Sequence, residues 1–293
     1  MRQPRPLSII SDPNPYDPTY QIDCYEYISN PTTRQQSLAF DLGRRLGSSI
    51  SGCHMRPHRH SAVSMASAFA DTAWRRKSTK TAPAAAKSLF RLLAEQHGYS
   101  MTRRAGPAPS ALWAERVGSP DRLMAILGPV ADLAIVSRPT KSGSVADMFM
   151  TAALTESSRP VLLLPQKNRR KIGRRVCIAW NQSGGAAQAV AAAMPLLQQA
   201  SAVTIVSCGP EDRAGPKSAQ LAAYLAHWGV DASCVATRGH DVEPELIAAC
   251  SDAGADLLVS GAYSRSRWRE RAFGGTTDYL IRKARIPVFM LHS

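Results

Sequence analysis

The segment GAYSRSRWRERAFGGTTD, residues 261 to 278, holds four arginines between a single glycine and a glycine pair. Gly274 and Gly275 stand at the start of a helical pattern, and the unpaired amides of a helix start attract anions. Thr276 and Thr277 can add hydroxyl donors, and arginine binds phosphate with a planar, charged fork. This spacing therefore has the chemistry of a phosphate-binding loop.

Two other interpretations of this segment stay open on the residues alone. The glycines can simply form a turn, with a threonine capping the helix and the arginines facing water. The second alternative is nucleic-acid binding, because the net charge of +14 favours anionic partners, and Tyr263 and Trp268 could stack on a base. A second basic run, QKNRRKIGRR at 166–175, has no acidic residue, and we interpret it as a solvated linker, which in the nucleic-acid alternative would bind together with the arginine segment.

The second half of the chain alternates short apolar runs with helical patterns. We expect strands at 174–180, 202–208, 230–237, 256–262 and 286–292, and helices at 186–200, 217–229, 242–254 and 276–284, with Pro195 kinking the first helix. Such alternation predicts right-handed crossovers and a parallel sheet covered on both faces. Ligands bind such sheets beyond the carboxyl ends of the strands, where the strand order reverses. The loops selected by this rule are WNQSGG at 180–185 and the segment 261–275.

The first half follows the same pattern less clearly. We expect a short strand within 21–29, further strands at 48–55, 98–104, 131–138 and 159–165, and helices at 34–47, 84–98, 121–130 and 145–157. ADLAIVS followed by RPVLLLP matches ADLLVSG followed by IPVFMLH, which indicates an internal repeat. We therefore predict a domain at 1–165, a basic linker at 166–175 and a second domain at 172–293. RPVLLLP and IPVFMLH are strongly apolar edge strands, and exposed edges of that kind tend to be paired.

RVCIAWNQSGGAAQAVAAAMPLL and ADLLVSGAYSRSRWRERAFGGTTDYLIRKARIPVFMLHS resemble the universal stress protein family in its tandem form. The resemblance covers the second half strongly and residues 34–165 weakly. It implies an α/β fold of two tandem doubly wound domains, each a mostly parallel five-stranded sheet flanked by helices, of the adenine nucleotide alpha hydrolase type. In that family such a domain either binds ATP or has lost the capacity to, so the resemblance implies a stress-response protein without catalysis whose C-terminal domain can bind ATP or AMP. In that family the last strand makes the dimer contact, so the resemblance implies that 161–164 pairs with 288–291 and that the two domains form an intramolecular pseudo-dimer. Further self-association stays open.

The nucleotide-binding members of the family resemble a pattern of Gly, two residues, Gly, nine residues, then Gly followed by Ser or Thr. Here Gly261 and Gly274 match the first and third glycines, and Ser264 stands at the second. Gly275 replaces the hydroxyl residue, and Thr276 and Thr277 follow one position late. This sequence therefore matches the phosphate-binding motif of the family only in part.

Near the adenine and ribose, Asn181 stands where the family usually has an aspartate, and Ser183 matches the small hydroxyl residue beside it. Asn181 can hydrogen-bond but lacks the carboxylate that would accept two ribose hydroxyls strongly. The matching loop of the first half has Gly143 alone, so we expect no nucleotide site there.

Other classes of protein find less support. SGGAAQ at 183–188 is similar to the SGGxDS loop of ATP pyrophosphatases, but Ala187 and Gln188 replace the Asp and Ser of an adenylating enzyme. There is no P-loop, HExxH or GxSxG motif, so we expect no catalytic residues. Scattered cysteines without a CxxC pair, and prolines and arginines within CHMRPHRH at 53–60, argue against a metal site. No apolar run is long enough to span a membrane, and LSII is too short for a secretory signal, so we expect a cytoplasmic protein.

Overall fold

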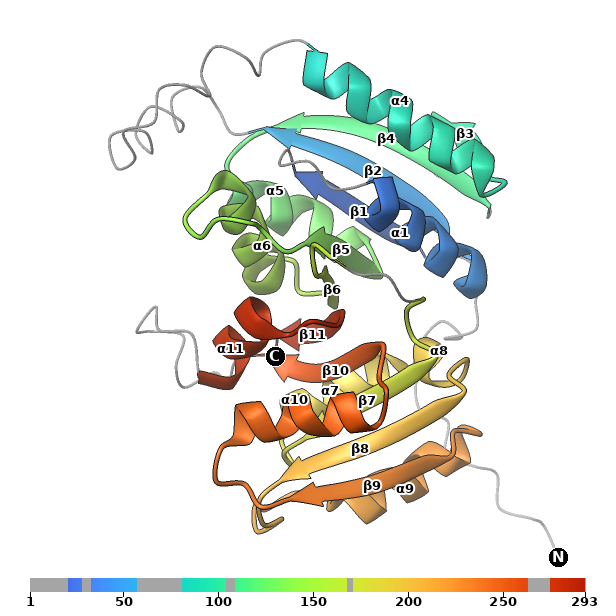
Figure 1. Ribbon diagram of the computed structural model, residues 1–293. Helices are drawn as coiled ribbons and strands as arrows, with labels where there is room; N and C mark the ends of the chain where they lie inside the picture. Colours follow the sequence, from blue (N-terminus) through green and yellow to red (C-terminus); the bar gives the residue numbers. More distant parts are fainter. Residues whose placement is uncertain are drawn as a thin grey trace, which may run out of the picture.

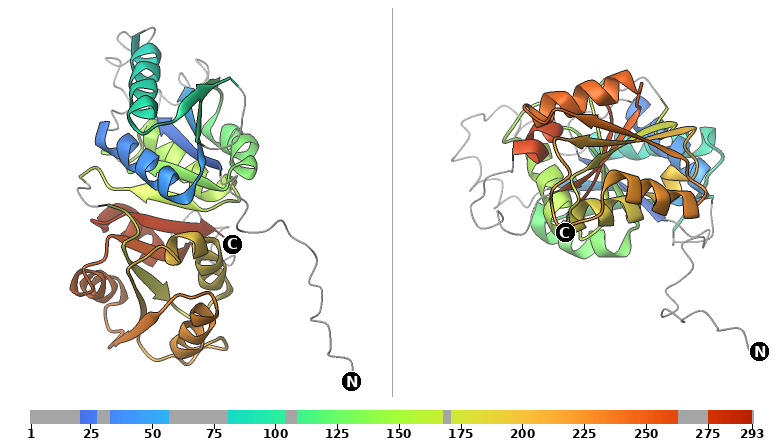
Figure 2. Two further views of the ribbon diagram at one scale, coloured as in Figure 1. Left: turned by 90° about the vertical axis from the view of Figure 1, so that its right-hand side faces the viewer. Right: turned by 90° about the horizontal axis from the view of Figure 1, so that it is seen from below.

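The computed structural model describes residues 21–27, 33–56, 81–103, 109–167, 171–262 and 275–292. Within these ranges the strands form one continuous sheet in the order β3-β4-β2-β1-β5-β6-β11-β10-β7-β8-β9. Figures 1 and 2 show the two halves stacked end to end along this sheet. The strands are β1 (Gln21–Tyr27), β2 (Ser49–Arg56), β3 (Ser100–Thr102), β4 (Ser110–Val117), β5 (Leu133–Ser137), β6 (Val161–Leu164), β7 (Arg175–Trp180), β8 (Ala202–Cys208), β9 (Ala232–Thr237), β10 (Leu257–Ala262) and β11 (Val288–His292).

Helices cover both faces of the sheet. They are α1 (Thr33–Leu46), α4 (Thr81–Gln96), α5 (Pro120–Leu127), α6 (Val145–Glu156), α7 (Gly184–Ala192), α8 (Met194–Leu197), α9 (Ser218–His227), α10 (Val242–Asp252) and α11 (Gly275–Lys283), with a 3-10 turn η1 (Gly128–Val130) after α5. One buried apolar cluster contains side chains of α1, α4, α7, α8 and α9, and the other contains side chains of α5, α6, α10 and α11. The predicted α/β class, with a mostly parallel sheet flanked by helices, is confirmed.

The same strand order occurs in both halves. In the first half it is β4-β2-β1-β5-β6, with β3 added outside β4, and in the second half it is β9-β8-β7-β10-β11. All neighbouring strands are parallel except β6 and β11, which pair antiparallel. Strand β11 meets β6 with Val288 opposite Leu163 and Met290 opposite Val161, so the expected pairing of the two last strands is present.

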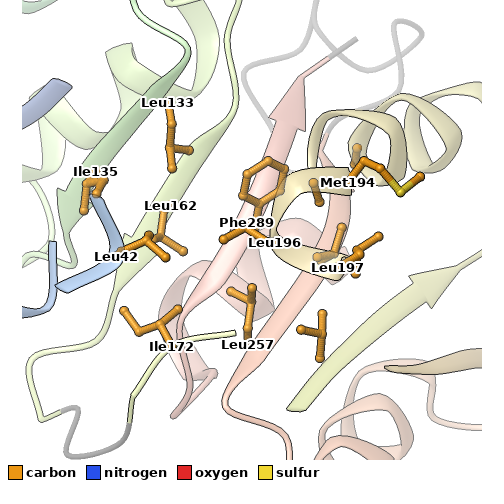
Figure 3. Close-up of a cluster of buried hydrophobic side chains, with 14 of the residues drawn as sticks. Leu42, Leu133, Ile135, Leu162, Ile172, Met194, Leu196, Leu197, Leu257 and Phe289 are labelled. Carbon is orange, nitrogen blue, oxygen red and sulfur yellow. The ribbon is translucent and has the colours of Figure 1, made fainter. Parts of the chain in front are cut away.

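The apolar sequence of β6 explains its place at the centre of the sheet. All four of its side chains are buried, because both faces of the strand are covered by helices. Leu162 and Leu164 belong to one cluster, and Val161 and Leu163 belong to the other. Figure 3 shows Leu162 and Phe289 close together between side chains of the two halves.

The structure corrects several details of the expected elements. Strand β4 lies between β2 and the short outer strand β3, yet no strand was expected at 110–117. The helix expected at 186–200, with a kink at Pro195, is fully interrupted beside that residue: α7 ends at Ala192 and α8 begins at Met194 with Pro195 in its first turn. The end of the expected linker is packed and not solvated: Ile172 is buried, and the amides of Gly173 and Arg174 donate to buried Asp256 at 2.7 and 2.9 Å.

Two general features of the described residues bear on function. None of the helices in these ranges is both long and apolar enough to cross a membrane. The same ranges hold no group of three or more His, Cys, Asp or Glu side chains placed to bind a metal ion. Cys53 and His54 are buried in β2, whereas the histidines at 58 and 60 lie outside the described residues.

Candidate functional site

The strand order of the second half reverses between β7 and β10. From β7 the chain moves outward through β8 to β9, and it then returns to β10 and β11 on the other side of β7. Helix α7 follows β7 on one face of the sheet, and α11 follows β10 on the opposite face. Both helices start at the carboxyl ends of the strands, where open α/β sheets bind ligands. We call residues 181–185, Gly261 and residues 275–277 the switch-point edge.

Gly261, at the end of β10, touches the backbone of the first turn of α7. A Cβ atom at this position would lie 2.8 Å from the carbonyl carbon of Gly185 and 2.9 Å from the amide nitrogen of Ala186. Real Cβ atoms do not approach other atoms this closely, so only glycine lets α7 start against β10. The first glycine of the sequence motif therefore has a packing role in this structure.

Asn181 and Ser183 form the start of α7. The Oδ1 atom of Asn181 accepts hydrogen bonds from Ser183 N at 3.2 Å and Ser183 Oγ at 2.6 Å. Ser183 Oγ in turn accepts from Ala186 N at 3.1 Å, which makes Ser183 the N-cap of the helix. Asn181 is exposed. Both expected ribose-site residues thus have local structural roles, and their side chains also lie at the switch-point edge.

Gln182, between them, is a residue that the sequence did not single out. It has φ of 60°, and its side chain is buried and bonded to the loop that follows β8. Its Nε2 donates to Arg213 O at 3.2 Å and Gly215 O at 2.9 Å, and its Oε1 accepts from Arg213 N at 3.2 Å. These bonds fix the 209–217 loop beside the switch-point edge. A polar residue in a loop gives no sequence signal for such a role.

The start of α11 is already in contact with a carboxylate. Thr276 Oγ1 donates to Oε1 of Glu243, in the first turn of α10, at 2.8 Å. A Cβ at Gly275 would lie 3.3 Å from the same oxygen. Thr277 is buried, while Gly275 is exposed. The remaining motif residues, Ser264 and Gly274, lie with the four arginines outside the described residues.

Two more carboxylates bind backbone amides near the ends of β8 and β9. Glu245 accepts from the amides of Gly239, His240 and Asp241 at 2.7, 3.0 and 3.2 Å. The nearby Thr237 hydroxyl and these amides lower the pKa of Glu245 to about 2. Such a carboxylate stays ionised and is a weak base at neutral pH.

Glu211 is held in a similar way. Its Oε1 accepts from Ser207 Oγ at 2.7 Å and from Ser218 N at 2.8 Å, at the start of α9. Burial raises the pKa of Glu211, but the bonds from Ser207 and Ser218 outweigh this effect and the net change is downward. Among the described residues, the carboxyl edge of the second half therefore carries three carboxylates, Glu211, Glu243 and Glu245, bonded to donors of the chain itself.

In the first half, side chains of the first turn of α6 occupy the backbone amides at the start of that helix. Gly143, with φ of 70°, donates its amide to Oδ2 of Asp147 at 2.8 Å, and Asp147 N donates to Ser144 Oγ at 3.2 Å. A negative charge of the chain itself thus lies where a phosphate would bind a helix start. These contacts favour the prediction that the first half has no nucleotide site.

Comparison with known proteins shows which family the chain resembles. A model of the universal stress protein family matches residues 174–292. No match is found among curated proteins. A universal stress protein from Archaeoglobus fulgidus has a similar solved structure, with a TM-score of 0.65 and 13% identity over 94% of this chain and 98% of that one.

Two solved structures from Pseudomonas aeruginosa have TM-scores of 0.57. One is a putative universal stress protein, 15% identical over 95% of both chains. The other is a functionally unknown protein, 14% identical over 94% of this chain and 92% of that chain. At such identities the likeness shows a shared fold across nearly the whole length. The second half, residues 174–292, is thus similar to the universal stress protein family in sequence, and the whole chain shares the fold of these solved structures.

Proposed function

We propose that the protein is a cytoplasmic, tandem universal stress protein whose second half binds an adenine nucleotide at the switch-point edge without hydrolysing it. The observation that carries this proposal is the contact of Gly261 with the backbone of Gly185. This contact brings the start of α7 against β10, from which the chain continues to α11. Two helix starts then lie at the strand-order reversal, where a phosphate and a nucleoside can be held together.

The tandem form is supported by the repeated strand order and by the antiparallel pairing of β6 with β11. This pairing covers an edge strand of each half, which would otherwise be available to another chain. The first half then serves as a scaffold: its β6 completes the sheet of the second half, and Asp147 already occupies the start of its own helix α6.

The absence of catalysis is proposed from the state of the carboxylates. Glu211 and Glu245 are bonded to hydroxyl and amide donors of the chain, which lower their pKa and make them weak bases. Asn181 supplies an amide in place of a carboxylate. We expect the protein to bind ATP and to release no phosphate from it above the rate in buffer.

Calorimetric titration of the whole chain with ATP and AMP tests this function. We expect one nucleotide per chain, and binding at least about tenfold weaker in Gly275→Asp, because a second carboxylate at the start of α11 repels phosphate. The control is Ser251→Asp, which adds the same charge near the end of α10, at the opposite edge of the sheet.

Equal affinity in wild type and Gly275→Asp would show that the start of α11 is not the phosphate site. No heat with either nucleotide would overturn nucleotide binding. Binding of single-stranded DNA that falls steeply with rising salt would instead favour the nucleic-acid function.

A further inference from the structure

Glu243 lies in the place that the proposed function assigns to a phosphate. Its Oε1 accepts a hydrogen bond from Thr276 Oγ1 at 2.8 Å and lies 3.3 Å from the position of a Cβ at Gly275. Thr276 is one of the hydroxyls expected to meet the nucleotide, and Gly275 is the first residue of α11. Thr276 Oγ1 has one hydrogen to donate, so it cannot donate to the carboxylate and to a phosphate at once.

We propose that Glu243 is an internal latch: its carboxylate occupies the phosphate position at the start of α11, and a nucleotide binds only by displacing it. This inference rests on the proposed function and adds its regulation. Two negative groups within a few ångströms of each other repel, so phosphate binding and the closed latch exclude each other. The net charge of +14 attracts anions to the molecule, and the latch sets which of them enter.

The carboxylate of Glu243 is held weakly enough to be displaced by a phosphate. In the described part of the chain its carboxylate accepts one hydrogen bond, from a side-chain hydroxyl, and the residue is half-buried. Glu245, two residues later, accepts three backbone amide bonds that shape the loop before α10. Release of Glu243 therefore costs one hydrogen bond and leaves α10 and its preceding loop in place, whereas release of Glu245 would open the loop.

The latch acts on phosphate and not on the nucleoside. A nucleotide with a phosphate chain supplies the negative charge and oxygen atoms that replace the carboxylate at Thr276, and adenosine does not. Removal of the charge at Glu243 should therefore strengthen ATP binding and leave adenosine binding unchanged.

Calorimetry with ATP and adenosine on three forms of the whole chain tests the latch: wild type, Glu243→Gln and Asp252→Asn. Gln keeps the length of the side chain and an oxygen that accepts from Thr276, so the fold should be preserved, and thermal unfolding verifies this. Asp252→Asn removes the same charge from the last residue of α10, at the opposite edge of the sheet. We expect ATP affinity to rise about tenfold or more in Glu243→Gln and to stay unchanged in Asp252→Asn, because only the first removes a charge at the phosphate position.

The outcomes separate the latch from the function on which it rests. ATP affinity that is equal or lower in Glu243→Gln than in a wild type that binds ATP would overturn the latch and leave nucleotide binding intact. A similar gain for adenosine would also overturn it, because the effect would not depend on phosphate. No binding of ATP by any of the three forms would overturn the latch and nucleotide binding together. Binding by Glu243→Gln alone would support both.

Discussion

Phe289 of β11 lies opposite Leu162 of β6 in the antiparallel pair that joins the two halves of the molecule. Their side chains are 2% and 0% exposed and belong to one apolar cluster, which contains residues of both halves. Each half therefore uses the other to cover its last strand and part of its core. Because neither strand edge nor core is completed within one half, we expect the two halves to unfold together.

Replacement of Phe289 by alanine should affect the stability of the whole chain. Loss of a fully buried phenylalanine typically lowers the free energy of unfolding by about 3–5 kcal/mol. Urea denaturation followed by circular dichroism measures this change, and a single transition should persist. The control is Tyr224→Ala on α9, where the side chain is 42% exposed and a much smaller loss is expected. Two separate transitions in wild type would show that the halves fold independently.

Arg138 provides a second link between the halves. It follows β5, and its guanidinium donates to the carbonyl oxygens of Ala284 and of Leu280, the latter at 3.2 Å, at the end of α11. Burial lowers the pKa of Arg138 to about 10, so the side chain stays protonated at neutral pH. A cation at a helix carboxyl terminus also interacts favourably with the helix dipole.

Arg138→Met should lower the free energy of unfolding by about 1.5–3 kcal/mol, the range for hydrogen bonds to a charged group. The methionine keeps most of the apolar packing. The control is Arg159→Met, since Arg159 is bonded to Pro129 O within the first half at an exposed position. Chemical denaturation of both variants gives the comparison. An equal, small effect of the two substitutions would mean that the link across the halves contributes nothing beyond a surface bond.

The lowered pKa of Glu245 predicts that the free energy of unfolding depends on pH. Its pKa in the folded protein is about 2, below the ordinary value of 4.5. A carboxyl group with a depressed pKa stabilises the fold above its unfolded pKa, and this contribution is lost as pH falls through the folded pKa. The stability difference between wild type and Glu245→Gln should therefore be full at pH 6 and shrink between about pH 4.5 and pH 2. Urea midpoints across this range measure it, and a constant difference would contradict the prediction.

Much of the fold could be predicted because local pattern and tertiary environment agree. The runs VLLL in β6 and LLVSGA in β10 are apolar because both faces of the strands are buried, and this pattern is visible in the sequence. Strand β4 was missed because SALWAERV lies near the outer edge of the sheet, where its last three residues are exposed. A half-exposed strand carries polar residues that hide its periodicity.

The candidate site could be predicted only in part. Sequence placed Asn181, Ser183 and Gly261 at the carboxyl edge, because the βα alternation fixes which loops meet there. It gave no signal for Gln182 or Glu243, since their partners, Gly215 and Thr276, are 33 residues distant in each case. Contacts between loops of different βα units depend on the packing of the helices, which no local pattern encodes.

Gly261 gives the last prediction, because its replacement tests the packing of the switch-point edge directly. In Gly261→Ala the new Cβ would lie 2.8 Å from the carbonyl carbon of Gly185, so β10 or the first turn of α7 must move. Such overpacking costs about 1–3 kcal/mol of stability, measured by urea denaturation. If nucleotide binds at this edge, ATP affinity should fall in the same variant.

The matched control is Gly184→Ala, one residue before Gly185. A Cβ there meets no atom within 4 Å, and alanine is favoured over glycine inside a helix by roughly 0.5–1 kcal/mol. Stability should therefore be kept or slightly increased at Gly184 and reduced at Gly261, although both substitutions add one methyl group to the same edge. Equal stability of the two variants would mean that α7 can shift without loss of stability. The close approach of β10 and α7 would then not be the reason why residue 261 is glycine.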